Sequence, residues 1–292
     1  MNNKKAYALL WLVPIIWGIT FPIIHLVIKD ISANLFVFWR FLIAGVILLP
    51  VLVQAISNRS VKIRDIKYGL ILGVINSGAF ICQSMALNHG NSAEVAFLTG
   101  INVILVPFLM PLFGLRSPSF IEVVAALFCL FGIYLVSNSS INSFSYEDIL
   151  VLFSALFIAI GIVVVEKAAL KSNNLKLLTF YQIIFTSIAP FIMLKGYIFD
   201  ARMLNSKVLM ILFYCAFFAT SLALFIQVKY QPIIGSNKTA IIFSMEAVFA
   251  TIFAYLFGEH ITLSVVIGGA IIILSSVLVD IIKSTNRNYL HQ

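Results

Sequence analysis

Charged residues are scarce in this chain, and their scarcity excludes most soluble proteins. Only 10% of the 292 residues are Asp, Glu, Lys or Arg, whereas about 25% is usual in a soluble domain. Hydrophobic residues make up 62% of the chain, more than one soluble core encloses. Because the apolar residues also fall in long repeated runs, we expect lipid to be the solvent.

Several chemical signatures are absent as well. The chain has no HExxH zinc motif, no GxxxxGK[ST] phosphate loop and no CxxC pair. Its aspartates lie near the ends of apolar runs, and its three cysteines lie inside such runs, as buried apolar residues do. We therefore expect no catalytic residue, no metal and no cofactor, and a membrane-embedded enzyme is the least favoured alternative. The basic residues are too scattered for a nucleic-acid surface.

What the chain does contain is ten apolar runs, most of them long enough to cross a bilayer, which takes about 20 residues. They predict an all-α integral membrane protein with ten transmembrane helices. The predicted spans are 6–28, 32–56, 66–87, 92–114, 119–137, 147–169, 175–198, 208–230, 237–257 and 262–283.

The lysines and arginines predict the orientation. With a cytoplasmic N-terminus, fourteen of the nineteen basic residues fall on the cytoplasmic side, including Arg116, Lys283 and Arg287. Four fall outside, and Arg40 lies within a span. This bias predicts that both termini are cytoplasmic, in a multi-pass protein of the inner (plasma) membrane.

The chain is similar to itself at an offset of about 144 residues. "FGLRSPSFIEVVAALFCLFGIYLV" aligns with "FGEHITLSVVIGGAIIILSSVLV". The aligned polar pairs are Asn76 with Thr220, Gln83 with Gln227, Asn102 with Glu246 and, at a slightly smaller offset, Arg40 with Gln182. Five spans per half is an odd number, so the second half is inverted. We predict two inverted five-helix repeats, 1–142 and 143–292, an organisation typical of secondary transporters.

Strongly polar residues cluster at one predicted depth. At 1.5 Å per residue, Arg40 and Glu246 each lie roughly 12 Å from opposite faces, near the centre of a core about 30 Å thick. Aromatic residues surround that layer and suit a partly apolar solute. The predicted substrate-binding residues are Trp17, Arg40, Asn76, Gln83, Asn102, Tyr181, Gln182, Thr220 and Glu246.

Glu246 leaves several interpretations open. A carboxylate in a span is paired, faces water or acts in transport. Glu246 can pair with Arg40, bind a substrate amine or carry a coupling proton, and a passive tie between helices is the structural alternative. Gly69 and Gly73 form a GxxxG motif, which favours a close contact inside the bundle over a dimer contact. We expect a monomer, with a dimer as the alternative.

Three segments resemble the EamA-type branch of the drug/metabolite transporter superfamily. They are "WLVPIIWGITFPI", "FVFWRFLIAGVILL" and "NKTAIIFSMEAVFATIFAYLFGEHIT". In that family the ninth span commonly reads S-x-E-P-V-F-A followed by G-E; here Ala247 stands at the usual Pro position. The resemblance covers the whole chain and implies export of amino acids, metabolites or drugs, with some members importing solutes.

We therefore expect a secondary transporter of small organic solutes that works by alternating access around a polar cavity at the midplane. Export is the expected direction, and import or exchange of a metabolite is the alternative. The expected partners are a small-molecule substrate and the lipid bilayer.

Overall fold

The computed structural model describes residues 3–114, 117, 119–137 and 145–275, and its regular elements in these ranges are all helical. The elements are α1 (Asn3–Gly18), α2 (Thr20–Ile28), α3 (Ala33–Ser57), α4 (Ile63–Leu87), α5 (Ser92–Thr99), α6 (Asn102–Leu109), η1 (Met110–Phe113), α7 (Phe120–Ser137), α8 (Tyr146–Lys171), α9 (Leu175–Thr186), α10 (Ile188–Met193), η2 (Ala201–Leu204), α11 (Ser206–Ala216), the π-helix η3 (Phe217–Leu222), α12 (Ala223–Ile234), α13 (Ser236–Ser244) and α14 (Glu246–Leu256).

These elements join into membrane-crossing helices. Within the described residues, eight stretches are long and apolar enough to cross a bilayer. Two shorter apolar helices, Val123–Gly132 and Leu263–Ser275, stand where the fifth and tenth spans were predicted. The prediction of an all-helical membrane protein is confirmed. The end of the predicted tenth span (276–283), like Arg116, Lys283 and Arg287, lies outside the described residues.

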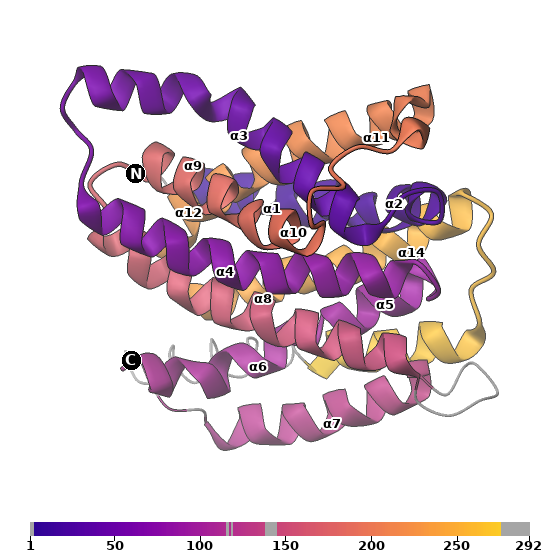
Figure 1. Ribbon diagram of the computed structural model, residues 1–292. Coiled ribbons are helices and arrows are strands. Elements are labelled where there is room, and N and C mark those ends of the chain that lie inside the picture. The colour runs from indigo at the N-terminus through magenta and orange to yellow at the C-terminus, as the bar shows by residue number, and fades with distance from the viewer. Residues whose placement is uncertain (1–2, 115–116, 118, 138–144, 276–292) are drawn as a thin grey trace, which may run out of the picture.

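The two halves of the sequence interleave in space. In Figure 1, α4 and α8 run side by side through the middle of the bundle. α4 also packs on α9, α1 packs on α12 and α14, and α5 packs on α14. Each of these contacts joins a helix of the first half to a helix of the second. Because the first half crosses the membrane an odd number of times, the second half runs through it with inverted orientation.

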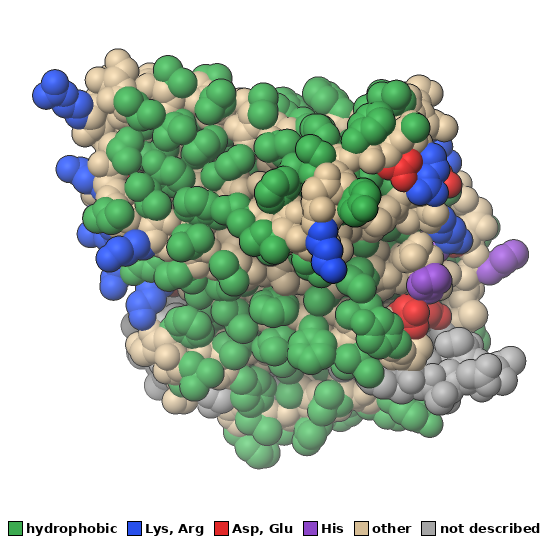
Figure 2. Space-filling view, viewed as in Figure 1, with side chains coloured by type: hydrophobic (Ala, Val, Ile, Leu, Met, Phe, Trp, Pro, Cys, Tyr) green, Lys and Arg blue, Asp and Glu red, His purple; other side chains and the backbone are tan. Residues whose placement is uncertain are grey.

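The outer surface matches a bilayer environment. Figure 2 shows hydrophobic side chains over most of the visible face, with many lysines and arginines along the left edge and others at the right and near the middle. Large apolar side chains such as Phe120 and Leu112 are about four-fifths exposed, which is costly in water and favourable in lipid.

Span seven ends earlier than the sequence suggested. It was predicted to reach residue 198, but its helix ends at Met193. Lys195 and Gly196 then adopt positive φ angles of 48° and 90°, which reverse the chain and end the helix. The segment that follows carries the η2 turn, capped by Asp200. The Arg202 side chain hydrogen-bonds Asp200 and holds its pKa at about 2.

The GxxxG motif on α4 is used inside the chain. A Cβ added to Gly69 would lie 2.3 Å from the Cβ of Tyr181, and one added to Gly73 would lie 2.5 Å from the Cβ of Phe185. Both contacts are on α9, so the two glycines allow these helices to approach closely, as small residues do in membranes.

We predict that Gly73→Ala lowers the thermal unfolding temperature of the detergent-solubilised protein. Its new methyl group would also meet the backbone carbon of Phe185 at 2.9 Å, and such overpacking costs about 1–3 kcal/mol. Gly161→Ala is the matched control, because its Cβ meets only ordinary contacts, the shortest 3.4 Å. Equal melting temperatures for the two variants would show that the contact with α9 is not tight.

Candidate functional site

Spans four and nine are interrupted in the same way. Between α5 and α6, and again between α13 and α14, the backbone hydrogen bonds shorten to an i→i−3 pattern. Asn102 is the first residue of α6 and Glu246 is the first residue of α14. The internal repeat aligns these two residues, so each half of the protein places a polar side chain at its interruption. Half-helices that begin inside the membrane are where transporters bind solutes.

A π-helix interrupts span eight beside the same region. Its Ala219 carbonyl accepts a hydrogen bond from the indole nitrogen of Trp17 at 2.8 Å and one from Arg40 Nη2 at 3.4 Å. Thr220 Oγ1 accepts from Arg40 Nε at 2.8 Å. A π segment exposes carbonyl groups that a regular α-helix would use internally, and here they hold Arg40 and Trp17.

The Arg40 guanidinium has no carboxylate partner among the described residues. It lies over the ring of Phe80, 4.6 Å from its centroid, and 5.6 Å from the centroid of Phe41. Aromatic faces attract cations, so this charge is stabilised by rings and carbonyl dipoles. The predicted possibility that Arg40 pairs with Glu246 is not realised in this structure, because no ion pair joins them.

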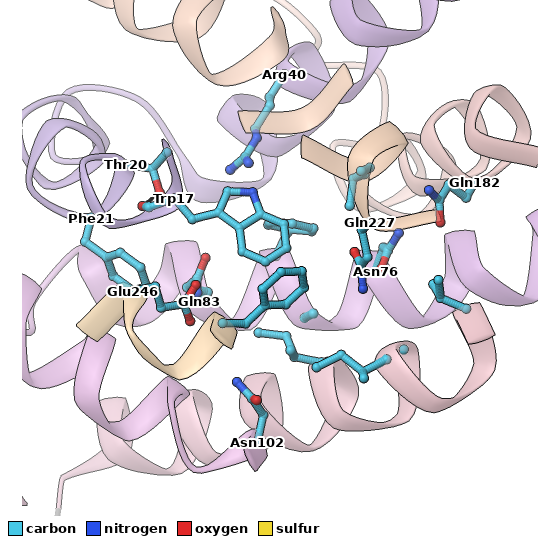
Figure 3. A pocket seen from close by; sticks show the side chains of 18 residues that line it. Trp17, Thr20, Phe21, Arg40, Asn76, Gln83, Asn102, Gln182, Gln227 and Glu246 are labelled. Carbon is cyan, nitrogen blue, oxygen red and sulfur yellow. Dashed lines mark hydrogen bonds between the residues drawn. The ribbon is translucent and has the colours of Figure 1, made fainter. Parts of the chain in front are cut away.

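These side chains surround one internal cavity of about 50 Å³, room for a few water molecules at 10–15 Å³ each. Figure 3 shows Trp17 near its centre, Arg40 to one side, Glu246 with Gln83 at one end, Asn76 with Gln227 at the other, and Asn102 opposite Arg40. Arg40 and Glu246 are 1% and 4% exposed. Phe21, Phe80 and Phe243 are among the apolar residues of the wall.

Several polar atoms of the wall have no partner within the part of the chain that the structure describes. They are Asn76 Nδ2, Asn102 Oδ1 and both amide atoms of Gln182. No described donor hydrogen-bonds the carboxylate of Glu246, which faces the cavity. Leaving buried polar groups unsatisfied costs about 1–3 kcal/mol each. These groups are therefore suited to bind a polar ligand or water.

The structure places seven of the nine predicted site residues on this wall: Trp17, Arg40, Asn76, Gln83, Asn102, Gln182 and Glu246. Two do not line it. Tyr181 packs beside Gly69 and stacks on Phe185, since neighbouring residues of a helix point about 100° apart. Thr220 lies behind Arg40 and holds its side chain.

Sequence reasoning missed other wall residues. Gln227 lines the cavity, and its alignment with Gln83 in the internal repeat was the signal that could have identified it. Thr20 and Phe21 also line the cavity, beside the break between α1 and α2. Pro22 leaves the Gly18 carbonyl without its helical donor there, but neither wall residue carries a sequence signal of its own.

Carboxylates bind the N-termini of both interrupted spans. At the start of α5, Glu259 accepts a hydrogen bond from the Ser92 backbone N–H at 2.9 Å. At the start of α13, on the opposite side of the membrane, Glu166 accepts from the Ser236 N–H at 2.6 Å and from its hydroxyl. Ser92 and Ser236 occupy equivalent positions of the repeat, so each half-helix is capped by an acid.

The fold and the cavity define a class: a multi-span membrane protein of two inverted repeats around a polar centre. The chain belongs to the EamA-like transporter family, whose model matches it twice, over residues 4–138 and 145–280. It is therefore a membrane transporter.

One curated relative agrees with this assignment, and one solved structure shares the fold. An uncharacterized transporter of Archaeoglobus fulgidus is 31% identical over 280 residues, which cover 94% of this chain and 86% of the relative. A crystal structure with 13% sequence identity superposes with a TM-score of 0.69 over 95% of this chain and 99% of the other. The second likeness shows the fold alone.

We predict that Thr220→Val destabilises the protein by about 1–3 kcal/mol, because it leaves Arg40 Nε buried without an acceptor. Thr186→Val is the matched control: its hydroxyl is equally buried and bonds only the carbonyl of Gln182 in its own helix. Thermal unfolding in detergent measures both. A loss in Thr186→Val as large as that in Thr220→Val would contradict the role given to Thr220.

Proposed function

We propose that this transporter moves small zwitterionic organic solutes, of the amino-acid type, by alternating access. The observation that supports it is the presence of a guanidinium and a carboxyl group, those of Arg40 and Glu246, on the wall of one cavity without an ion pair between them. A solute carrying an ammonium and a carboxylate offers a partner to each of these groups. Phe21, Phe80 and Phe243 offer apolar contacts to its side chain.

The wall offers acceptors and donors at different places. Glu246 and the free Oδ1 of Asn102 are acceptors suited to an ammonium group. Arg40 and the free Nδ2 of Asn76 are donors suited to a carboxylate. Trp17 lies between these groups in Figure 3. This arrangement supports a substrate with both charges more strongly than a simple cation or anion.

The small size of the cavity and the contacts at the N-termini of the interrupted spans support alternating access. A volume of 50 Å³ is well below the roughly 300 Å³ or more of ordinary ligand pockets, so the halves must separate to admit a solute. We propose that the contact of Glu259 with Ser92 opens toward one side, and the contacts of Glu166 with Ser236 open toward the other, in turn. Repeats 1–142 and 143–292 are the moving units.

Orientation and direction complete the proposal. The basic edge in Figure 2 supports termini on the cytoplasmic side of the inner membrane. Outward transport is proposed from the family resemblance, and a monomer is proposed because the GxxxG motif is occupied within the chain. Proton coupling at Glu246 is the second candidate role, favoured by the absence of any described donor to its carboxylate.

We predict that Glu246→Gln lowers counterflow of labelled amino acids in proteoliposomes by about tenfold or more, because a hydrogen bond to a charged group contributes about 1.5–3 kcal/mol. The wild type should carry leucine and exclude N-acetylleucine, which lacks the ammonium, and the variant should lose this discrimination. Glu147→Gln is the control, since Glu147 lies at the start of α8 outside the cavity.

The same assay separates the two roles of Glu246. Loss of binding in Glu246→Gln indicates recognition of the substrate, whereas counterflow that persists but no longer responds to a pH gradient indicates proton coupling. If no amino acid shows saturable counterflow with the wild-type protein, the proposed substrate class is wrong.

A further inference from the structure

A groove on the outside of the bundle is lined by residues that do not line the central cavity. It has a volume of about 200 Å³ and is lined by Leu48 and Val51 of α3, Lys176 and Thr179 of α9, and Phe225 of α12. Four of these five side chains carry no charge. The exception is Lys176, the second residue of α9, at the end where that helix enters the membrane.

The lining residues lie at increasing depth within one leaflet of the membrane. Lys176 stands at the level where α9 begins, and Val51 lies six residues before the end of α3, about 9 Å deeper by the helical rise. Phe225 lies nine residues before the end of α12, about 14 Å deep on the same scale. The groove therefore runs from the headgroup level into the hydrocarbon, with its positive charge at the polar end.

A second lysine stands beside the groove. Lys229 is one turn after Phe225 on α12, and its ammonium lies 5.4 Å from the ring centroid of Phe225 and 5.2 Å from that of Tyr230. Among the described residues no carboxylate forms an ion pair with Lys176 or Lys229. Two unpaired cations at the polar end of an apolar, lipid-facing groove complement one phosphate followed by an acyl chain.

We propose that this groove is a binding site for an anionic glycerophospholipid of the leaflet facing the basic edge of the protein. The phosphate is held by Lys176 and Lys229, and an acyl chain lies along Leu48, Val51 and Phe225. Because the lipid bridges α3 of the first half with α9 and α12 of the second, its binding stabilises the contact between the repeats. This site is separate from the central cavity and independent of the proposed substrate.

The test uses the purified full-length chain in a neutral detergent. Phosphatidylglycerol should raise the thermal unfolding temperature saturably and appear as one retained lipid in native mass spectrometry, whereas phosphatidylcholine should bind more weakly. The double variant Lys176→Gln, Lys229→Gln should bind phosphatidylglycerol about thirtyfold more weakly, since each lysine near a phosphate contributes about fivefold. Soluble glycerol 3-phosphate should have no effect, because it lacks the acyl chain.

Two further variants make the test specific. Lys171→Gln with Lys238→Gln removes two exposed lysines of the same side outside the groove and should leave phosphatidylglycerol binding unchanged. Val51→Trp keeps both charges and fills the groove, and should weaken lipid binding even if the lysine double variant does not fold. Equal losses in both lysine pairs, equal stabilisation by glycerol 3-phosphate, or a second copy of the chain retained in place of lipid would each overturn the proposal.

Discussion

The absence of water from the bilayer core is the constraint on which the rest of this structure depends, because every freed backbone carbonyl there needs a donor from within the protein. The Thr99 carbonyl, where span four breaks, accepts from Asn102. The Ala219 carbonyl in the π-helix accepts from Trp17 and Arg40. Polar side chains thus satisfy the interruptions of spans four and eight, and two of them, Asn102 and Arg40, line the central cavity.

This requirement also explains why polar side chains stand among the aromatic ones around the cavity. A side chain that hydrogen-bonds a freed carbonyl uses only part of its hydrogen-bonding capacity. Asn102 donates from its amide nitrogen to the Thr99 carbonyl and leaves its Oδ1 without a described partner. Arg40 is anchored by Thr220 through Nε, and rings face the rest of its charge. Asn102 and Arg40, which bind carbonyl groups at the interrupted spans, are therefore also available to a solute in the cavity.

The helices, the repeat and most of the polar side chains on the wall of the cavity could be predicted from sequence, because apolar runs and a fixed offset are long-range signals. The offset of 144 residues paired Asn102 with Glu246, and the structure puts both at equivalent interruptions. Rotation about a helix axis was harder to predict: Tyr181 and Gln182 share a depth, but only Gln182 faces the cavity. The π-helix has no residue signature, so the attachment of Arg40 to Thr220, in place of an ion pair with Glu246, was not predictable.

The central claim is that the two ends of the cavity open alternately, and paired spin labels test it most directly. In a variant without native cysteines, one pair replaces His89 and His260 near the Glu259–Ser92 contact, and another replaces Lys171 and Lys238 near the Glu166–Ser236 contacts; all four side chains are exposed. Distance distributions measured with and without a transported solute should show one pair widening while the other stays close. Conformations in which both pairs are wide at once would indicate a continuous pore and contradict the account.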